Sequence, residues 1–283
     1  MTFKTMLEER RAVLVPGAAN ALSGRIIEAL GFEAIYVTGA GVTNMALGLP
    51  DLAFIDLTQI AQFTASIREV TELPLIVDAD TGFGNAINVG HSVRVLERAG
   101  ASAIQIEDQL SPKRCGHFEG KALVPAAEMA AKVRAAVDAR RSAETLIVAR
   151  TDARAVEGID GAIERAERYI EAGADVTFVE APRNEDEMRA IASRLSVPQV
   201  ANLVVGGKTP IVDQSTLAGM GFAITLYANV ALQGAILGMR NALTALSRDG
   251  RMDESDLVAS FAERQRYVDK DHFDELDRRY ASA

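Results

Sequence analysis

The chain of 283 residues contains one cysteine, Cys115, and a single thiol excludes an intramolecular disulfide. This scarcity of cysteine fits a reducing cytoplasm. The sequence also lacks a block of basic residues that would offset its net charge of -9, so a nucleic-acid surface is not expected. Its first residues, MTFKTMLEERR, lack the apolar core of a secretion signal. These absences predict a cytoplasmic protein with no nucleic-acid partner.

Charge is absent from one long segment, Gln214 to Met239, which has the length of a membrane span. The segment nevertheless holds four glycines and the polar residues Thr225, Tyr227, Asn229 and Gln233. We therefore predict no membrane span here, but a strand followed by a buried helix. A helix that is apolar all round packs against a large core or against another subunit.

No linker rich in proline or serine divides the chain, so we expect one domain over residues 1–283. Residues 245–283 are expected to form a C-terminal helical tail, with a solvated, charge-rich helix over Arg264–Arg279. Eight short apolar runs predict strands at Ala12–Val15, Ala34–Val37, Leu75–Val77, Ala103–Ile106, Leu146–Ala149, Val176–Val179, Gln199–Asn202 and Ala223–Leu226. Helices are predicted between them, for example at Leu57–Val70, Asn88–Ala99, Ala126–Ala139, Gly161–Ala172 and Glu185–Arg194.

Near-continuous apolar strands separated by helices are typical of a parallel sheet that is buried on both faces. Eight such units predict an α/β fold, the (β/α)8 TIM barrel, with a doubly wound open sheet as the alternative. Polar residues follow the strands at their carboxyl ends: Tyr36, Thr38, Asp78, Asp80, Glu107, Asp108, Arg150, Thr151, Asp152, Glu180, Asn202 and Tyr227. In a barrel these ends form one mouth, where active sites are built. The repeated placement indicates an enzyme rather than a non-catalytic barrel.

Two aspartates after the third predicted strand suit a metal site. Asp78 and Asp80 point to the same face of an extended chain, where their charges repel unless a cation or a shared proton neutralises them. Glu107 follows the next strand, and Asp51 lies in a loop. Carboxylate oxygens without a cluster of His or Cys favour Mg²⁺, with Mn²⁺ as a substitute. The alternative is that the segment from Asp78 only caps the next helix and turns the chain.

The single thiol lies in a positively charged segment. Cys115 is flanked by Lys113, Arg114 and His117, and such a field favours thiolate and proton transfer at sulfur. Further along, Arg150 suits a planar substrate carboxylate.

An internal ion pair between Arg150 and Glu180 is the alternative role, and both roles can hold at once. Gly39, Ala40 and Gly41 follow Thr38 and offer backbone N–H groups to a carboxylate as a small nest.

Six segments carry a resemblance to a known family: Tyr36-Val-Thr-Gly, Leu49-Pro-Asp51, Val77-Asp-Ala-Asp80-Thr-Gly-Phe-Gly, Ile106-Glu-Asp-Gln109, Lys113-Arg-Cys-Gly-His117 and Ala149-Arg-Thr-Asp152. In this order they resemble the isocitrate lyase/phosphoenolpyruvate mutase superfamily, over about Val15 to Thr244. The Lys113–His117 segment is specific for its carbon–carbon lyase branch.

The resemblance implies a barrel whose last helix swaps between paired subunits of a homotetramer, a dimer of helix-swapped dimers. It implies Mg²⁺ bound directly by Asp80, and through water by Asp51, Asp78 and Glu107. A mobile loop carrying Cys115 would close over a small di- or tricarboxylate. The implied substrate contacts are Thr38, Gly39, Ala40, Gly116, His117, Arg150, Glu180, Asn202 and Gln233. The implied catalytic residues are Cys115, Tyr36, Lys113, His117 and Arg150.

The implied reaction is a retro-aldol cleavage of a 2-hydroxy dicarboxylate to a 2-oxo acid and a carboxylate-stabilised enolate. Cys115 would protonate the enolate carbon as general acid, while the base is left open with Tyr36 as a candidate.

Two departures from the family pattern narrow the substrate. Methylisocitrate lyases carry an arginine where this chain has Gln233, and a glutamate where it has Val205. An uncharged glutamine cannot bind the third carboxylate of a tricarboxylate as arginine does. The stretch Asn202–Pro210 resembles the dimethylmalate lyase and petal death protein group. We therefore expect a 2-alkylmalate such as 2,3-dimethylmalate, cleaved to pyruvate and propionate. The alternatives are 2-methylisocitrate lyase and oxaloacetate hydrolase or decarboxylase, whereas Cys115 disfavours phosphonate chemistry.

Overall fold

The computed structural model of the chain describes residues 2–113 and 120–281. Eight parallel strands lie in the order β6-β5-β4-β3-β2-β1-β8-β7. They are β1 (Val13–Ala18), β2 (Ile35–Val37), β3 (Leu75–Asp78), β4 (Ala103–Glu107), β5 (Leu146–Thr151), β6 (Val176–Val179), β7 (Val200–Asn202) and β8 (Ile224–Tyr227). An isolated parallel bridge between Thr177 and Gln199 joins the two edge strands, so the sheet curls into a barrel. The predicted (β/α)8 barrel is confirmed, and the open-sheet alternative is wrong.

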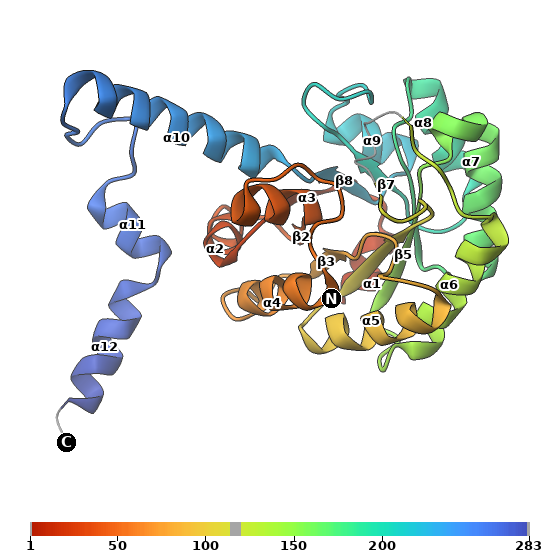
Figure 1. Cartoon of the computed structure of the whole chain (residues 1–283), viewed down its shortest axis with the longest axis horizontal. Coiled ribbons are helices and arrows are strands. Elements are labelled where there is room, and N and C mark those ends of the chain that lie inside the picture. The colour runs from red at the N-terminus through yellow and green to blue at the C-terminus, as the bar shows by residue number, and fades with distance from the viewer. Residues whose placement is uncertain (1, 114–119, 282–283) are drawn as a thin grey trace.

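Helices cover the outside of the barrel (Figure 1). They are α2 (Ala21–Ala29), α3 (Gly39–Val42), the π-helix η1 (Thr43–Leu47), α4 (Leu57–Arg68), α5 (Ala86–Arg98), α6 (Ala126–Ala139), α7 (Arg154–Glu171), α8 (Glu185–Arg194) and α9 (Gln214–Met220). Helix α1 (Phe3–Glu8) instead packs Phe3 and Leu7 against the inward-facing residues of the strands. Capping explains where several begin: Asp56 accepts a hydrogen bond from the N–H of Gln59, and Asn85 accepts one from Asn88. The helix predicted at Gly161–Ala172 corresponds only to the part of α7 that follows a kink at Gly158, where φ is 80°.

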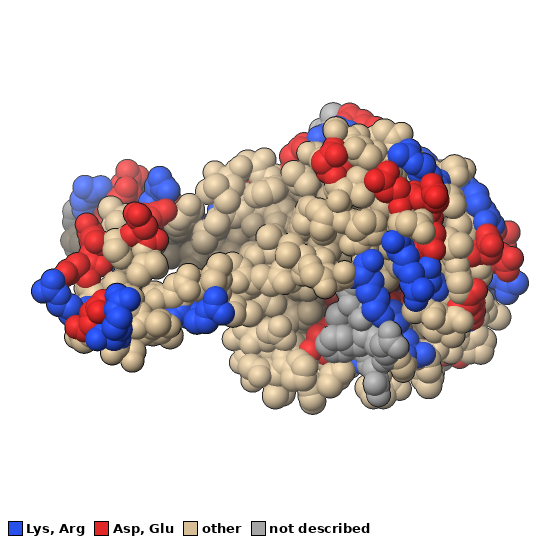
Figure 2. Space-filling view, turned by 90° about the horizontal axis from the view of Figure 1, so that it is seen from above, with Lys and Arg blue, Asp and Glu red and all other residues tan. Residues whose placement is uncertain are grey.

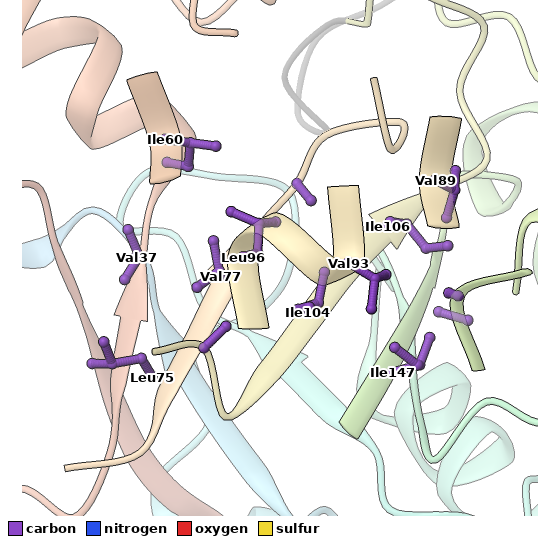
Figure 3. Close-up of a cluster of buried hydrophobic side chains, with 14 of the residues drawn as sticks. Val37, Ile60, Leu75, Val77, Val89, Val93, Leu96, Ile104, Ile106 and Ile147 are labelled. Atoms are coloured by element: carbon purple, nitrogen blue, oxygen red, sulfur yellow. The ribbon is translucent and has the colours of Figure 1, made fainter. Parts of the chain in front are cut away.

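Two apolar layers explain why the strands are apolar on both faces, one inside the barrel and one between the strands and the helices. Val77 and Ile104 from β3 and β4 pack against Val93 and Leu96 of α5 (Figure 3). Each of these side chains is at most 1% exposed. Full burial of a side chain such as Leu96 contributes about 1.5–3 kcal/mol, so this layer stabilises the packing of α5 against β3 and β4.

The C-terminal part of the chain leaves the barrel. Helix α10 (Val230–Asp249) projects away from it and leads to α11 (Phe261–Tyr267) and α12 (Lys270–Tyr280) (Figure 1). The expectation of a buried helix after β8 is wrong for the isolated chain, because Ala245 is the one described residue of α10 that is buried. The solvated helix predicted over Arg264–Arg279 is present as two exposed helices, because Asp269 adopts a left-handed φ of 58° and separates α11 from α12.

None of the helices within the described residues is both long and apolar enough to cross a membrane. The division into one barrel domain and a tail from residue 245 stays a prediction.

Candidate active site

A cavity opens at the carboxyl ends of the barrel strands. Its lining consists of Tyr36, Thr38, Ala40, Asp51, Asp78, Lys113, Arg150, Glu180, Asn202, Val204, Leu226, Ala228 and Asn229. A smaller hollow adjoins it and shares Asp51 and Asp78 with it, adding Gly39 and Asp80. The parallel topology therefore brings together residues that are up to about two hundred positions apart, as expected for the mouth of a barrel.

The acidic side of the cavity is built at the end of β3. Asp78 is 8% exposed and accepts a hydrogen bond from the amide of Gln105 at 3.4 Å. Gly39 lies against both aspartates: a Cβ at this position would be 3.2 Å from Asp78 Oδ2 and 3.6 Å from Asp80 Oδ1. A larger residue where β2 leads into α3 would therefore press on the Asp78 carboxylate, and glycine leaves that carboxylate room to face the cavity.

Lys113 inserts its ammonium among these acids. Its Nζ lies 2.6 Å from Asp51 Oδ1 and 3.1 Å from Asp80 Oδ1. Burial lowers the pKa of Lys113, but the charges of Asp80 and Asp78 outweigh burial and raise that pKa well above its usual value. Burial raises the pKa of Asp80 to about 7, although the Lys113 ammonium opposes this shift.

These residues fit a divalent cation. The Lys113 ammonium is already a cation held between two carboxylates, and the chemistry of the donors is that of a hard oxygen site. Glu107 Oε1 is buried without a hydrogen-bond partner in the described chain. No group of three or more His, Cys, Asp or Glu side chains among residues 2–113 and 120–281 gathers closely enough to hold a metal alone. Mg²⁺ suits such a site, since it keeps several waters and few protein ligands.

Arg150 supplies the fixed positive charge of the cavity. Its guanidinium donates to both oxygens of Asp152, at 3.0 and 3.2 Å, and lies 3.2 Å from Glu107 and 3.1 Å from Glu180. It also lies over the ring of Phe178, 5.0 Å from the centroid. Burial lowers the pKa of Arg150, but the surrounding carboxylates raise it well above its usual value. The predicted ion pair with Glu180 is confirmed, and Arg150 still lines the cavity.

The opposite wall is polar but less charged. Asn202 donates to Glu180 Oε2 at 3.2 Å, and its own Oδ1 is buried with no partner among the described residues. Tyr36 is 3% exposed, and burial together with the charge of Asp78 raises the pKa of its phenol well above the usual value. Thr38 Oγ1 accepts a hydrogen bond from the N–H of Gly41 at 3.1 Å, which fixes the turn into α3 beside the cavity.

Some predicted residues are not placed in the cavity. Cys115, Gly116 and His117 fall within 114–119, outside the described residues, so their roles stay predictions. Gln233 is exposed and is not among the residues that line the cavity, and its Nε2 is 3.5 Å from the carbonyl oxygen of Val205. Its predicted contact with substrate also stays a prediction.

Other residues of the site were not assigned a role from the sequence, although Asp152 was placed at the mouth of the barrel. Asp152 holds Arg150, and the alternation of side chains along an extended strand was a usable signal, because positions two apart share a face. Asn229 and Ala228 line the cavity just beyond β8, and no motif marks them. The side-chain oxygen Oδ1 of Asn229 is buried and accepts no hydrogen bond within the described chain.

The comparison with protein families matches residues 3–247 to the phosphoenolpyruvate phosphomutase family. The chain belongs to the phosphoenolpyruvate mutase/isocitrate lyase superfamily. The resemblance inferred from the sequence motifs is thereby confirmed. The family assignment and the geometry agree, since the matched residues include every strand of the barrel and all the residues of the cavity.

Two curated relatives are lyases. The chain is 42% identical over 281 residues to a 2-methylisocitrate lyase of Aeropyrum pernix, an alignment that covers 99% of this chain and 90% of the relative. It is 39% identical over 280 residues to the 2,3-dimethylmalate lyase of Eubacterium barkeri, covering 99% of this chain and 97% of the relative. The prediction of an enzyme from the lyase branch is in line with both relatives.

Solved structures show the same architecture. A crystal structure of 2,3-dimethylmalate lyase has a TM-score of 0.92 and 32% identity, covering 98% of this chain and 93% of that chain. A structure of phosphonopyruvate hydrolase in complex with oxalate and Mg²⁺ has a TM-score of 0.88 and 29% identity, covering 99% of this chain and 100% of that chain. The second neighbour was therefore solved with both Mg²⁺ and oxalate, a small dicarboxylate, bound to it.

Proposed function

We propose that this chain is a Mg²⁺-dependent lyase that cleaves the C2–C3 bond of a 2-hydroxy dicarboxylate such as 2,3-dimethylmalate. One observation carries the proposal: the cavity that Arg150 lines, together with the hollow that adjoins it, pairs the carboxylates of Asp51, Asp78 and Asp80 with the fixed guanidinium of Arg150. The 39% identity to a 2,3-dimethylmalate lyase supports the choice of substrate.

Four acidic residues are proposed to hold the ion: Asp80 directly, and Asp51, Asp78 and Glu107 through water. A bound divalent cation would lower the pKa of a coordinated hydroxyl and polarise the neighbouring carboxylate. Lys113, between Asp51 and Asp80, would balance the remaining negative charge. Mn²⁺, which also prefers oxygen ligands, is proposed as a substitute ion.

The residues around the cavity would orient the substrate. The guanidinium of Arg150 is immobilised by Asp152 and would bind one substrate carboxylate. The backbone N–H groups of Gly39 and Ala40, after Thr38, would bind the other as a nest. Glu180 and Asn202 would line the pocket beside them.

The chemical step requires one proton to leave and one to arrive. When the C2 hydroxyl loses its proton, C2 becomes the carbonyl carbon of pyruvate, and the electron pair of the C2–C3 bond moves to C3. The carboxylate on C3 stabilises that charge, helped by the adjacent cations. Protonation of C3 then yields propionate, and we propose Cys115 as the donor, with His117 beside it. Tyr36 lines the cavity and is the candidate base that removes the proton of the C2 hydroxyl.

A panel of substrates tests this function. Purified protein with Mg²⁺ is incubated with 2,3-dimethylmalate, 2-methylisocitrate or oxaloacetate, and release of keto acid or of oxalate is measured. We expect pyruvate from 2,3-dimethylmalate, loss of this activity with EDTA, and its return with added Mg²⁺. No keto acid from any of the three substrates would refute the proposal.

2-Methylisocitrate lyase is the second candidate, because the Aeropyrum pernix relative is 42% identical. The cavity argues against a tricarboxylate substrate, which would need a further positive charge. Lys113 and Arg150 are the two cationic side chains among the described residues of its lining, and both already contact carboxylates of the protein. Gln233 and Val205 are exposed and bring no positive charge for a third carboxylate. Faster turnover of the tricarboxylate than of 2,3-dimethylmalate would reverse this order.

We further propose that the chain forms a homotetramer built from helix-swapped dimers. Apolar side chains of α10 are open to solvent in the single chain, with Leu243 62% exposed and Ile236 50% exposed. The arm they form is mostly uncharged between the barrel and the charged tail (Figure 2). An apolar groove lies between α2 and the start of α10, lined by Leu22 and Ile26 on one side and Leu232 on the other. Helix α10 of a second copy would cover these surfaces, which water would otherwise contact.

A further inference from the structure

We infer that Lys132, on α6, is a positioning residue that holds the loop of Asp80 in its metal-binding conformation. The inference rests on the magnesium site proposed above. It concerns the backbone that presents Asp80, and Lys132 itself lies outside the cavity lining.

The loop after β3 has an unfavourable backbone. Asp80 has a φ of 47° and Phe83 a φ of 59°, both in the left-handed region that residues with a Cβ rarely adopt. Gly82 and Gly84 between and after them also have positive φ, at 86° and 143°. Such a conformation costs free energy and persists only where the surrounding structure holds it.

Three consecutive carbonyl groups of this loop are held by three different elements. The oxygen of Asp80 accepts from the N–H of Glu107, on β4, at 2.9 Å. The oxygen of Thr81 accepts from Nζ of Lys132, on α6, at 3.1 Å. The oxygen of Gly82 accepts from the hydroxyl of Ser92, on α5, at 3.1 Å. The direction of the Asp80 side chain is therefore set by contacts from outside its own loop.

Lys132 differs from the other two donors because it brings a charge into the core. Lys132 is 4% exposed, and within the described chain its ammonium donates a hydrogen bond to the carbonyl oxygen of Thr81. The charge of Glu128, one turn earlier on α6, attracts the Lys132 ammonium, but the two form no ion pair among the described contacts. Burying an ammonium without a directly bonded carboxylate is costly, and an apolar side chain of the same length would pack on α6 at lower cost. The charge-assisted bond to Thr81 is the compensation that the structure offers.

The adjacent residue of α6 provides a matched control. Val133 is fully buried and packs in the hydrophobic core, and its apolar side chain cannot donate a hydrogen bond to the loop carbonyls. Val133→Ala would weaken the same helix without removing the bond to Thr81. Lys132→Met removes the ammonium and keeps an unbranched apolar side chain.

The test is titration of the purified proteins with Mn²⁺, followed by electron paramagnetic resonance of the free ion. We expect Lys132→Met to bind Mn²⁺ about tenfold or more weakly, the usual effect of losing an outer-shell partner, while Val133→Ala binds as the wild type does. Lys132→Arg, which keeps a charged donor, should recover part of the affinity. Equal affinity of Lys132→Met and Val133→Ala would overturn the inference.

Two further variants keep the outcomes distinct. If circular dichroism shows that Lys132→Met is unfolded, Lys132→Ala replaces it, because alanine also removes the ammonium and favours the helix. Wild-type Mn²⁺ affinity in that folded variant would overturn the inference. Asp80→Asn tests the site itself: Mn²⁺ binding by this variant as tight as that of the wild type would refute the proposed metal site, and the inference with it. Loss of binding in Asp80→Asn with normal binding in Lys132→Met would refute the inference alone.

Discussion

The ammonium of Lys121 lies 2.9 Å from Oδ1 of Asp152, and both side chains are at most 2% exposed. Asp152 also accepts two hydrogen bonds from Arg150, so one buried carboxylate joins two cations. Burial raises the pKa of Asp152, but Arg150 and Lys121 outweigh it and lower that pKa to about 2. The carboxylate is therefore ionised in the folded chain at neutral pH, and it fixes the direction of Arg150.

Asp152→Asn should destabilise the fold and impair the site together. Removing one partner of a buried ion pair leaves uncompensated charge, at a cost of about 3 kcal/mol or more in the free energy of unfolding. Unfolding in urea measures this change. Asp160→Asn is the control, because Asp160 pairs with Arg194 at 2.7 Å on the surface, where its side chain is 79% exposed. That variant should change stability by less than about 1 kcal/mol, and an equal effect of both variants would contradict the prediction.

Glu97 should make the stability of the fold depend on pH. Burial raises the pKa of Glu97, but hydrogen bonds from the N–H groups of Arg141 and Ser142 and from Thr145 outweigh it, so the pKa is lowered from 4.5. Because the folded pKa is the lower one, the carboxylate stabilises the fold above pH 4.5, and this contribution is lost as the pH falls through the lowered value.

The variant Glu97→Gln measures that contribution. At pH 7 the free energy of unfolding of this variant should be about 1 kcal/mol or more lower than that of the wild type, because hydrogen bonds to a charged group are lost. The difference should shrink as the pH falls below 4.5. The nearby exposed Glu144→Gln serves as the control, and a difference for Glu97→Gln that stays constant from pH 7 to the acid range would contradict the assignment.

Cys115→Ser should separate chemistry from binding. If the thiol protonates C3, its replacement should lower kcat by about 100-fold or more, because a positioned general acid contributes at least that factor. Calorimetric titration with Mg²⁺ should meanwhile give an unchanged affinity, since the proposed ligands are the carboxylates of other segments. An unimpaired kcat would remove the acid role, and lost Mg²⁺ affinity would assign Cys115 to the metal site instead.

Leu243→Lys should disrupt the proposed tetramer. This side chain is 62% exposed on α10 in the single chain, and a charge there would oppose burial against a second copy. Light scattering after size-exclusion chromatography gives the mass of the particle. Ile87→Lys is the control, because Ile87 is 84% exposed on α5, which lies away from α10 (Figure 1). A wild-type mass equal to that of one chain would contradict the proposal itself.

Most of the barrel could be predicted because its signals are local. Each apolar run that predicted a strand overlaps the strand that formed, and Glu185–Arg194 is a helix with the predicted bounds. Polar residues at strand ends, such as Asp78 and Arg150, met in one cavity because parallel strands in a closed barrel all point the same way. The location of α10 could not be predicted, since an apolar helix is satisfied equally by its own core or by another subunit's surface.

The amino-acid sequence alone determined where the strands lie along the chain, which acidic and basic residue types follow them, and to which family the chain belongs. Only the tertiary structure decided which of those groups pair: Lys113 with Asp51, Lys121 with Asp152, and Lys132 with the carbonyl of Thr81. The physical reason is distance along the chain. Periodicity reports contacts within one turn or one strand, whereas these bonds join segments that only the closure of the barrel brings within about 3 Å of each other.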